Sequence, residues 1–337
     1  MKNSSMIWKL ILGIVISCGF LFLAFRKIDF SQMKNALQNA NYYMFIPAIV
    51  LMFLGHWLRA IRWHYLIRPL KRIRIGRLFT ALLIGYMGNT VLPAHLGEFI
   101  RAYIIGKKED VPMSAAVGTI VVERIIDMFS LFIIMMVTLA LYPFPEWMKE
   151  LVMPMGILTL VMVFFLVLLK KSNTYAEKIL QKIISILPER FSQKIQQMVH
   201  SFLNGIVGLE KSQDYLIIFG YSLLIWGAYW GFLHIDFYAF HLAGTPQIGA
   251  ISSLVLLVTT TVAIVIPSSP GYIGTYHLIC QETLMMFGIS RAMGLSFAIV
   301  SHVVNILPVF LVGLVLFWKE GLNLMAIKKV REQSVGA

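Results

Sequence analysis

Residues 85–101 read GYMGNTVLPAHLGEFIR, and the rest of the chain is interpreted from this stretch. It follows an apolar run, residues 78–84, which is too short to cross a bilayer because a spanning helix needs about 20 apolar residues. Gly88, Pro93 and Gly97 then interrupt it. Such breaks at membrane depth are tolerated only inside protein or along a cavity. We expect a re-entrant hairpin over residues 78–105, and the alternative is a kinked span.

The composition is that of an integral membrane protein. Of the 337 residues, 58% are hydrophobic and only 13% are charged, and the mean hydropathy is +0.78. These values predict an all-α, multi-pass protein of the cell (inner) membrane, with residues 1–337 forming a single polytopic domain. Cys18 and Cys280 lie in apolar runs and predict no disulfide.

About six full spans are predicted, and two other segments connect them. Residues 26–42 are expected to be a loop. Residues 170–214 carry apolar side chains at helical spacing, which predicts a cytoplasmic insert of amphipathic helices on the membrane surface or capping the bundle, or alternatively a docking module. The predicted spans are residues 6–25, 43–66, 113–141, 151–169, 215–241 and 292–317.

A second interrupted hairpin is predicted at residues 248–288. Its tip contains Pro267, Pro270, Gly271 and Gly274, and the spacing Pro267-x-x-x-Gly271 repeats the Pro-x-x-x-Gly spacing of the first tip. Broken helices at matching places in two halves are typical of inverted repeats with a binding site between them. We therefore expect repeat one at about residues 7–141 and repeat two at about residues 151–317.

The distribution of basic residues predicts the orientation. With both termini in the cytoplasm, 21 of the 29 Lys and Arg residues fall in the inner segments and 5 in the outer loops. This bias follows the positive-inside rule. The net charge of +13 then describes a cytoplasmic face next to anionic lipid, and no nucleic-acid partner is needed to explain it.

Charged residues inside the predicted spans are the main site candidates. Arg59 and Arg62 share one helix face, and Glu123 and Asp127 share another. A charge at this depth costs at least about 2.5–3.5 kcal/mol, so these side chains should face the interior and pair. Either the four form a structural network, or the two arginines and Arg101 hold an anionic headgroup, because guanidinium matches phosphate with two hydrogen bonds.

Further polar residues extend these two alternatives. Asn89 and Glu98 flank the first tip and are predicted to take part in headgroup binding, and Arg124, about 100° round its helix, joins the charge network. No spacing of Cys and His predicts a metal site, no nucleotide motif is present, and no catalytic residue or cofactor is predicted. Secondary candidates in later apolar segments are His234, Asp236, Glu282 and His302.

Four motifs in order resemble the flippase-like family, the membrane region shared with lysylphosphatidylglycerol synthases (multiple peptide resistance factors). The resemblance covers about residues 7–320 and implies a membrane domain that binds or flips a lipid. In two-domain relatives a soluble domain charges the lipid from aminoacyl-tRNA; that domain is absent here, so we expect a stand-alone member. The motifs are Leu58-Arg59-Ala60-x-Arg62-Trp63, Gly85-x3-Asn89-x3-Pro93-x3-Gly97-Glu98-x2-Arg101, Glu123-Arg124-x2-Asp127 and Pro267-x2-Pro270-Gly271-x2-Gly274.

The late loop departs from the pattern of the resembled family. Tyr272 occupies a position where that family tends to have glycine, and His277 stands where an acid is expected. The leading hypothesis is translocation of an anionic or aminoacylated phospholipid. The alternatives are a phosphatidylglycerol lysyltransferase, as the family name suggests, and a non-transporting subunit that presents a polyprenyl-phosphate lipid to a glycosyltransferase. The expected partners are membrane phospholipid and a lipid-modifying enzyme.

Overall fold

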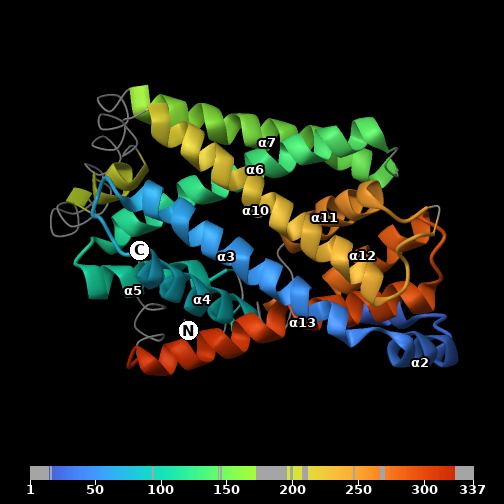
Figure 1. Ribbon diagram of the computed structural model, residues 1–337. Coiled ribbons are helices and arrows are strands. Elements are labelled where there is room, and N and C mark those ends of the chain that lie inside the picture. Colours follow the sequence, from blue (N-terminus) through green and yellow to red (C-terminus); the bar gives the residue numbers. More distant parts are fainter. Residues whose placement is uncertain are drawn as a thin grey trace.

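The computed structural model describes residues 15, 17–92, 95–142, 144, 146–171, 196–197, 200–206, 212–245, 247–265 and 270–322, and in these residues it contains helices and no strand (Figure 1). The all-α prediction is therefore confirmed for the described part. The elements are α2 (Phe30–Asn39), η1 (Tyr42–Met44), α3 (Phe45–Ile67), α4 (Ile75–Val91), α5 (Gly97–Glu109), α6 (Met113–Leu141), α7 (Glu146–Lys171), α10 (Ser212–Ala239), α11 (Ala250–Val265), η2 (Pro270–Tyr272), α12 (Thr275–Met286) and α13 (Arg291–Lys319).

Among the described residues, three helices are long and apolar enough to cross a membrane: α3 with η1, α10 and α13. Much of their surface is apolar and exposed, as in Val50, Leu223 and Leu311, which suits contact with lipid chains. Helix α6 has 29 residues and would extend about 43 Å at 1.5 Å per residue. It also carries three charged residues, so its place in a membrane depends on how those charges are paired.

Helices α3 and α10 form the antiparallel centre of the bundle (Figure 1). Their contact is close because glycines replace larger side chains: a Cβ on Gly55 would lie 3.0 Å from the Tyr229 ring, and one on Gly231 would lie 2.6 Å from the Leu51 side chain. Arg68 and Asp214, which form an ion pair at 2.7 Å, join the end of α3 to the start of α10. This pair places residues from both halves of the chain side by side.

Helices α4 and α5 form the first helical hairpin, and the break between them lies where the sequence predicts it. At about 1.5 Å per residue, α4 is about 25 Å long and α5 about 20 Å, both shorter than a hydrocarbon core of about 30 Å. They run antiparallel, because Arg77 pairs with Glu109 at one end and Asn89 contacts Gly97 at the other.

Helices α11 and α12, with η2 at the turn, form the second hairpin. Thr283 donates a hydrogen bond to Thr259 at 3.0 Å across its two legs. In Figure 1, α4 and α5 lie toward one end of the bundle and α11 and α12 toward the other. The packing is reciprocal between the halves: α4 lies against α13, and α11 lies against α6.

The prediction of a loop at residues 26–42 is wrong, because most of this segment is helix α2. Asp29 caps this helix, and its Oδ1 accepts hydrogen bonds from the backbone N–H of Ser31 at 2.9 Å and of Gln32 at 3.1 Å. Aspartate at this position is a standard start signal. The helix is short and mostly polar, with only Ala36 buried, so hydrophobic run length gave no indication of it.

Only part of the predicted insert at residues 170–214 falls within the described residues. Residues 200–206 are helical and lie against the start of α6. Gly118 and Gly205 face each other there, and a Cβ on either would overlap backbone of the other segment. Leu203 of the same helical segment is buried. This part of the insert therefore packs on the bundle, and residues 172–195 lie outside the described residues.

Candidate functional site

Two acids on α6 face two arginines on α3. Arg59 Nη1 lies 2.7 Å from Asp127 Oδ2 and 3.3 Å from Glu123 Oε1. Arg62 Nη2 lies 2.6 Å from Asp127 Oδ1 and 3.8 Å from Glu123 Oε1. All four residues are buried. The ion pairs expected of a structural network are therefore present, as the cost of an unpaired charge in a membrane requires.

Helix α5 adds another arginine and acid to this cluster. Arg101 Nη1 lies 3.2 Å from Glu123 Oε2, and Arg101 Nη2 forms an ion pair with Glu98 Oε2 at 2.6 Å. The Arg101 guanidinium also lies 4.8 Å from the centroid of the Trp63 ring, and Trp63 Nε1 donates a hydrogen bond to Thr119 Oγ1 at 3.0 Å. Arg101 is buried within α5.

Arg124 differs from the other three arginines in its exposure. Its Nη2 lies 2.7 Å from Glu98 Oε1 and its Nη1 lies 3.5 Å from Asp127 Oδ2, so it belongs to the same network. Its side chain is 40% exposed, whereas none of the other three exceeds 8%. With four arginines and three acids, the cluster has an excess of one positive charge, and Arg124 is the arginine that opens outward. The seven members are Arg59, Arg62, Glu98, Arg101, Glu123, Arg124 and Asp127.

Helix α10 contributes partners that the sequence analysis did not identify. Tyr229 OH accepts a hydrogen bond from Arg59 Nε at 2.6 Å, and Ser222 Oγ accepts one from Arg62 Nη1 at 3.0 Å. His56 Nδ1 lies 3.5 Å from Tyr229 OH. Ser222 and Tyr229 are seven residues apart, which puts them on one helix face. That spacing was the available signal, but it does not identify arginines as their partners.

The first hairpin tip is held by Asn89. Its Oδ1 accepts a hydrogen bond from the backbone N–H of Gly97 at 2.8 Å, so the residue predicted to bind a headgroup serves to close the break in the described structure. Gly85 lies against Gly97, and a Cβ on Gly97 would overlap the Gly85 carbonyl oxygen. Only glycine permits this approach of two backbones.

The two hairpin tips touch each other. Tyr272 OH lies 3.2 Å from His95 Nδ1, and the ring centroids are 5.7 Å apart. Both residues have left-handed backbone, with φ of 55° at His95 and 58° at Tyr272. Such conformations are uncommon outside glycine and cluster at functional sites. The interrupted segments of the two halves therefore meet through two strained residues.

The remaining predicted tip residues are two glycines and three prolines. Gly271 and Gly274 have φ of 67° and 94°, which is the region that glycine adopts readily. Pro270 begins η2. Pro93 and Pro267 lie outside the described residues, so the match between their positions stays a prediction.

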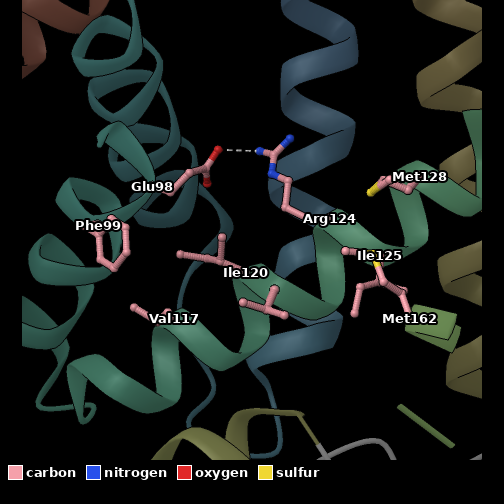
Figure 2. Close-up of a pocket in the computed structure, with 9 residues that line it drawn as sticks. Glu98, Phe99, Val117, Ile120, Arg124, Ile125, Met128 and Met162 are labelled. Carbon is pink, nitrogen blue, oxygen red and sulfur yellow. Dashed lines mark hydrogen bonds and ion pairs between the residues drawn. The ribbon is translucent and has the colours of Figure 1, made fainter. Parts of the chain in front are cut away.

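A groove of about 300 Å³ lies between α5, α6 and α7, beside the open side of the cluster (Figure 2). In Figure 2 the Glu98–Arg124 ion pair lies at one edge, and apolar side chains form the rest of the wall. The site thus combines one exposed guanidinium with an apolar wall. The apolar lining residues are Phe99, Val117, Ile120, Val121, Ile125, Met128 and Met162.

Comparison with known proteins gives both a family and several relatives. A UPF0104 membrane protein of Methanothermobacter thermautotrophicus is 22% identical over 313 residues, covering 88% of this chain and 90% of that protein. One from Methanocaldococcus jannaschii is 23% identical over 310 residues, covering 88% and 91%. Glycosyltransferase AglD of Haloferax volcanii is 28% identical over 123 residues, covering 36% of this chain and 20% of that protein.

The family model described as the lysylphosphatidylglycerol synthase TM region matches residues 10–313. That range includes all seven charged residues of the cluster, both hairpins and the groove. With most of its length matched, the protein is a membrane protein that belongs to the lysylphosphatidylglycerol synthase transmembrane-region family.

Proposed function

We propose that this protein binds a lipid with an anionic headgroup in the groove beside Arg124 and translocates it between leaflets. The observation that carries the proposal is the exposure of Arg124 at the edge of the apolar groove, in a cluster with one excess positive charge. The phosphate of the headgroup would bind beside the guanidinium of Arg124. An acyl chain would lie along the apolar wall, and burial of apolar surface would stabilise it.

Arg124 is the arginine that would contact the lipid first. Arg59, Arg62 and Arg101 are buried and engaged by carboxylates in the described structure. Arg124 shares Glu98 with Arg101, so a phosphate at Arg124 would compete with the Glu98 carboxylate. Contact of the headgroup with the three buried arginines and with Asn89 stays a prediction, and it requires these ion pairs to open.

The proposed topology has about six spans and two re-entrant hairpins in an inverted repeat, with both termini in the cytoplasm of a cell (inner) membrane. Reciprocal packing of α4 on α13 and of α11 on α6 supports the repeat. The contact between the tips supports a site at the interface of the repeats. Rocking of one half against the other would then open the groove to either leaflet.

The test is lipid binding and transbilayer movement in an Arg124→Gln variant. Native mass spectrometry on gently solubilised protein would measure retained phosphatidylglycerol. Vesicles of phosphatidylcholine with fluorescent phosphatidylglycerol would measure movement. We expect the variant to lose at least tenfold in both, because one charge-assisted hydrogen bond to phosphate contributes about 1.5–3 kcal/mol, and about 1.4 kcal/mol corresponds to tenfold.

Arg291→Gln is the matched control. Arg291 is 39% exposed and pairs with Glu282 at 3.2 Å, much as Arg124 pairs with Glu98, but it lies outside the groove. We expect this control to bind and move lipid as the unaltered protein does. Equal lipid retention and movement in the two variants would contradict the assignment of Arg124.

The similarity to glycosyltransferase AglD supports a second candidate function. In this alternative the same groove holds a polyprenyl-phosphate lipid and presents it to a glycosyltransferase without moving it across the membrane. Native mass spectrometry would then show a retained polyprenyl phosphate, and the vesicle assay would show no transbilayer movement. A glycosyltransferase would also copurify with the protein.

A further inference from the structure

A second buried polar cluster lies in the other half of the molecule, around Asp236 near the end of α10. Asp236 is fully buried, and its Oδ2 accepts a hydrogen bond from Ser301 of α13. Within the part of the chain that the structure describes, its Oδ1 has no hydrogen-bond partner. Among the described residues, no arginine, lysine or histidine forms an ion pair with it.

This isolation distinguishes Asp236 from the three acids of the seven-residue cluster. Glu98, Glu123 and Asp127 each lie within 4 Å of at least two arginines, so each is stabilised as a carboxylate. A carboxylate without a cation is strongly disfavoured in an apolar interior, and the group takes a proton instead. The surroundings of Asp236 therefore favour its neutral form.

The position of the cluster mirrors that of the ionic network. Glu123 is the eleventh residue of α6 and Arg124 the twelfth; Ser301 is the eleventh residue of α13 and His302 the twelfth. In the first half, α6 pairs with α3, and in the second half, α13 pairs with α10 through Asp236. The two halves thus place an ionised cluster and an uncharged one at corresponding points.

The helices around Asp236 carry several titratable side chains. From α12, Tyr276 and Cys280 lie close enough to interact with its charge. From α13, His302 stacks on Tyr276 with ring centroids 4.6 Å apart. On α10 itself, His234 lies about one turn before the end of the helix, and its Nδ1 lies 3.2 Å from Ser253 Oγ of α11. None of these groups is a fixed cation.

The cluster is connected to the hairpin tips. His277 lies with its ring centroid 4.8 Å from that of His302, and its Nδ1 lies 3.3 Å from the backbone N–H of Gly274. Two residues before Gly274, Tyr272 contacts His95 of the first hairpin. A change in charge at Asp236 can therefore alter the packing that joins the two tips.

We propose that Asp236 is a proton-binding site whose occupancy is coupled to movement of the anionic lipid at Arg124. This inference rests on the proposed function. The proton comes from the aqueous phase on the side where α10 ends, binds the Asp236 carboxylate to give the neutral acid, and leaves to the opposite side when the hairpin tips separate. The Ser301 hydroxyl donates to the carboxylate in the ionised form and holds it in place.

The test is the ratio of lipid movement with and without a pH gradient across the vesicle membrane. We expect external acid to speed movement of fluorescent phosphatidylglycerol severalfold in the unaltered protein. In Asp236→Asn, which has nearly the same shape but cannot ionise, the ratio should fall to unity. Glu282→Gln removes an exposed acid of α12 and should keep the ratio of the unaltered protein.

Several outcomes would overturn the proposal. A gradient response preserved in Asp236→Asn would do so, and so would lipid movement in the unaltered protein that ignores the pH gradient or follows a sodium gradient instead. In the last two cases the observed lipid movement would still support the proposed function, and it would contradict the proton site at Asp236. If no lipid binds or moves at all, the proposed function fails.

A direct measurement decides the proton site even if the asparagine variant does not fold. Infrared difference spectroscopy of the purified, unaltered protein at neutral pH should show the carbonyl stretch of a protonated carboxylic acid, since the other buried acids are ion-paired. The band should disappear at high pH. Its absence at neutral pH would show an ionised Asp236 and overturn the inference.

Discussion

At the scale of single residues, Asp127 makes the shortest ion pairs between α6 and α3. Its two oxygens each pair with a different arginine of α3, at 2.7 and 2.6 Å. Arg59 and Arg62 therefore depend on one carboxylate for their shortest ion pairs. Removing one partner of a buried pair leaves an uncompensated charge, which costs more than the pair itself contributes.

Asp127→Asn should lower the free energy of unfolding by about 3–5 kcal/mol. Thermal unfolding in detergent, followed by loss of the folded species, would measure it. The double variant Asp127→Asn with Arg62→Gln should lose less than the two single changes added together, because it removes a charge of each sign. Asp110→Asn changes an exposed residue outside the network and should have little effect. Equal losses at positions 110 and 127 would show that the network does not stabilise the fold.

At the scale of elements, the first hairpin depends on backbone contact between its two helices. Gly85, Gly88 and Gly97 bring α4 and α5 together, and Asn89 hydrogen-bonds across the break. Because the helices of the hairpin are shorter than the hydrocarbon core of a bilayer, spanning the bilayer cannot fix their position. Its stability comes from this contact and from the packing of α4 on α13, where Gly313 lies against Leu83 and Met87.

Gly97→Ala should separate the legs of the hairpin, because the new methyl group would overlap the Gly85 carbonyl oxygen and press on Asn89. We expect a large loss of thermal stability or of folded yield, and lost lipid movement in protein that still folds. Gly227→Ala is the control: a Cβ there meets nothing within 4 Å, so the yield should be unchanged. Normal stability of Gly97→Ala would argue against tight packing of the hairpin.

At the scale of the whole molecule, the two halves are joined in three ways. The α3–α10 pair forms the centre, the hairpins pack reciprocally on α13 and α6, and the tips meet through His95 and Tyr272. Each contact joins one half to the other. Movement of the halves against each other would change all three contacts together, which is the behaviour expected of an inverted-repeat carrier.

The proposed orientation can be tested by labelling single cysteines in intact cells. In a Cys18→Ser, Cys280→Ala background, Lys34→Cys on α2 and Lys319→Cys at the end of α13 each place a thiol at an exposed position. A membrane-impermeant thiol reagent should label position 34 in intact cells and position 319 only after the cells are opened. The reverse pattern would show that the termini face outward.

The sequence by itself determined the class of the protein, the approximate bounds of most described helices and the places where the hairpins break. These features depend on run length, periodicity and glycine, all of which are local along the chain. It also determined that Arg59, Arg62, Glu123 and Asp127 face inward, because unpaired charges are costly in a membrane. It did not reveal helix α2, whose start signal is a single capping aspartate.

Only the tertiary structure decided which charges pair and which remain open. Arg124 is exposed because α5 and α7 leave a groove beside α6, and the spacing of residues on α6 contains no information about that groove. Asp236 is joined to Ser301, 65 residues away, and among the described residues no arginine or lysine forms an ion pair with it. Partner choice depends on which side chains meet when helices distant in sequence pack together, so periodicity alone cannot determine it.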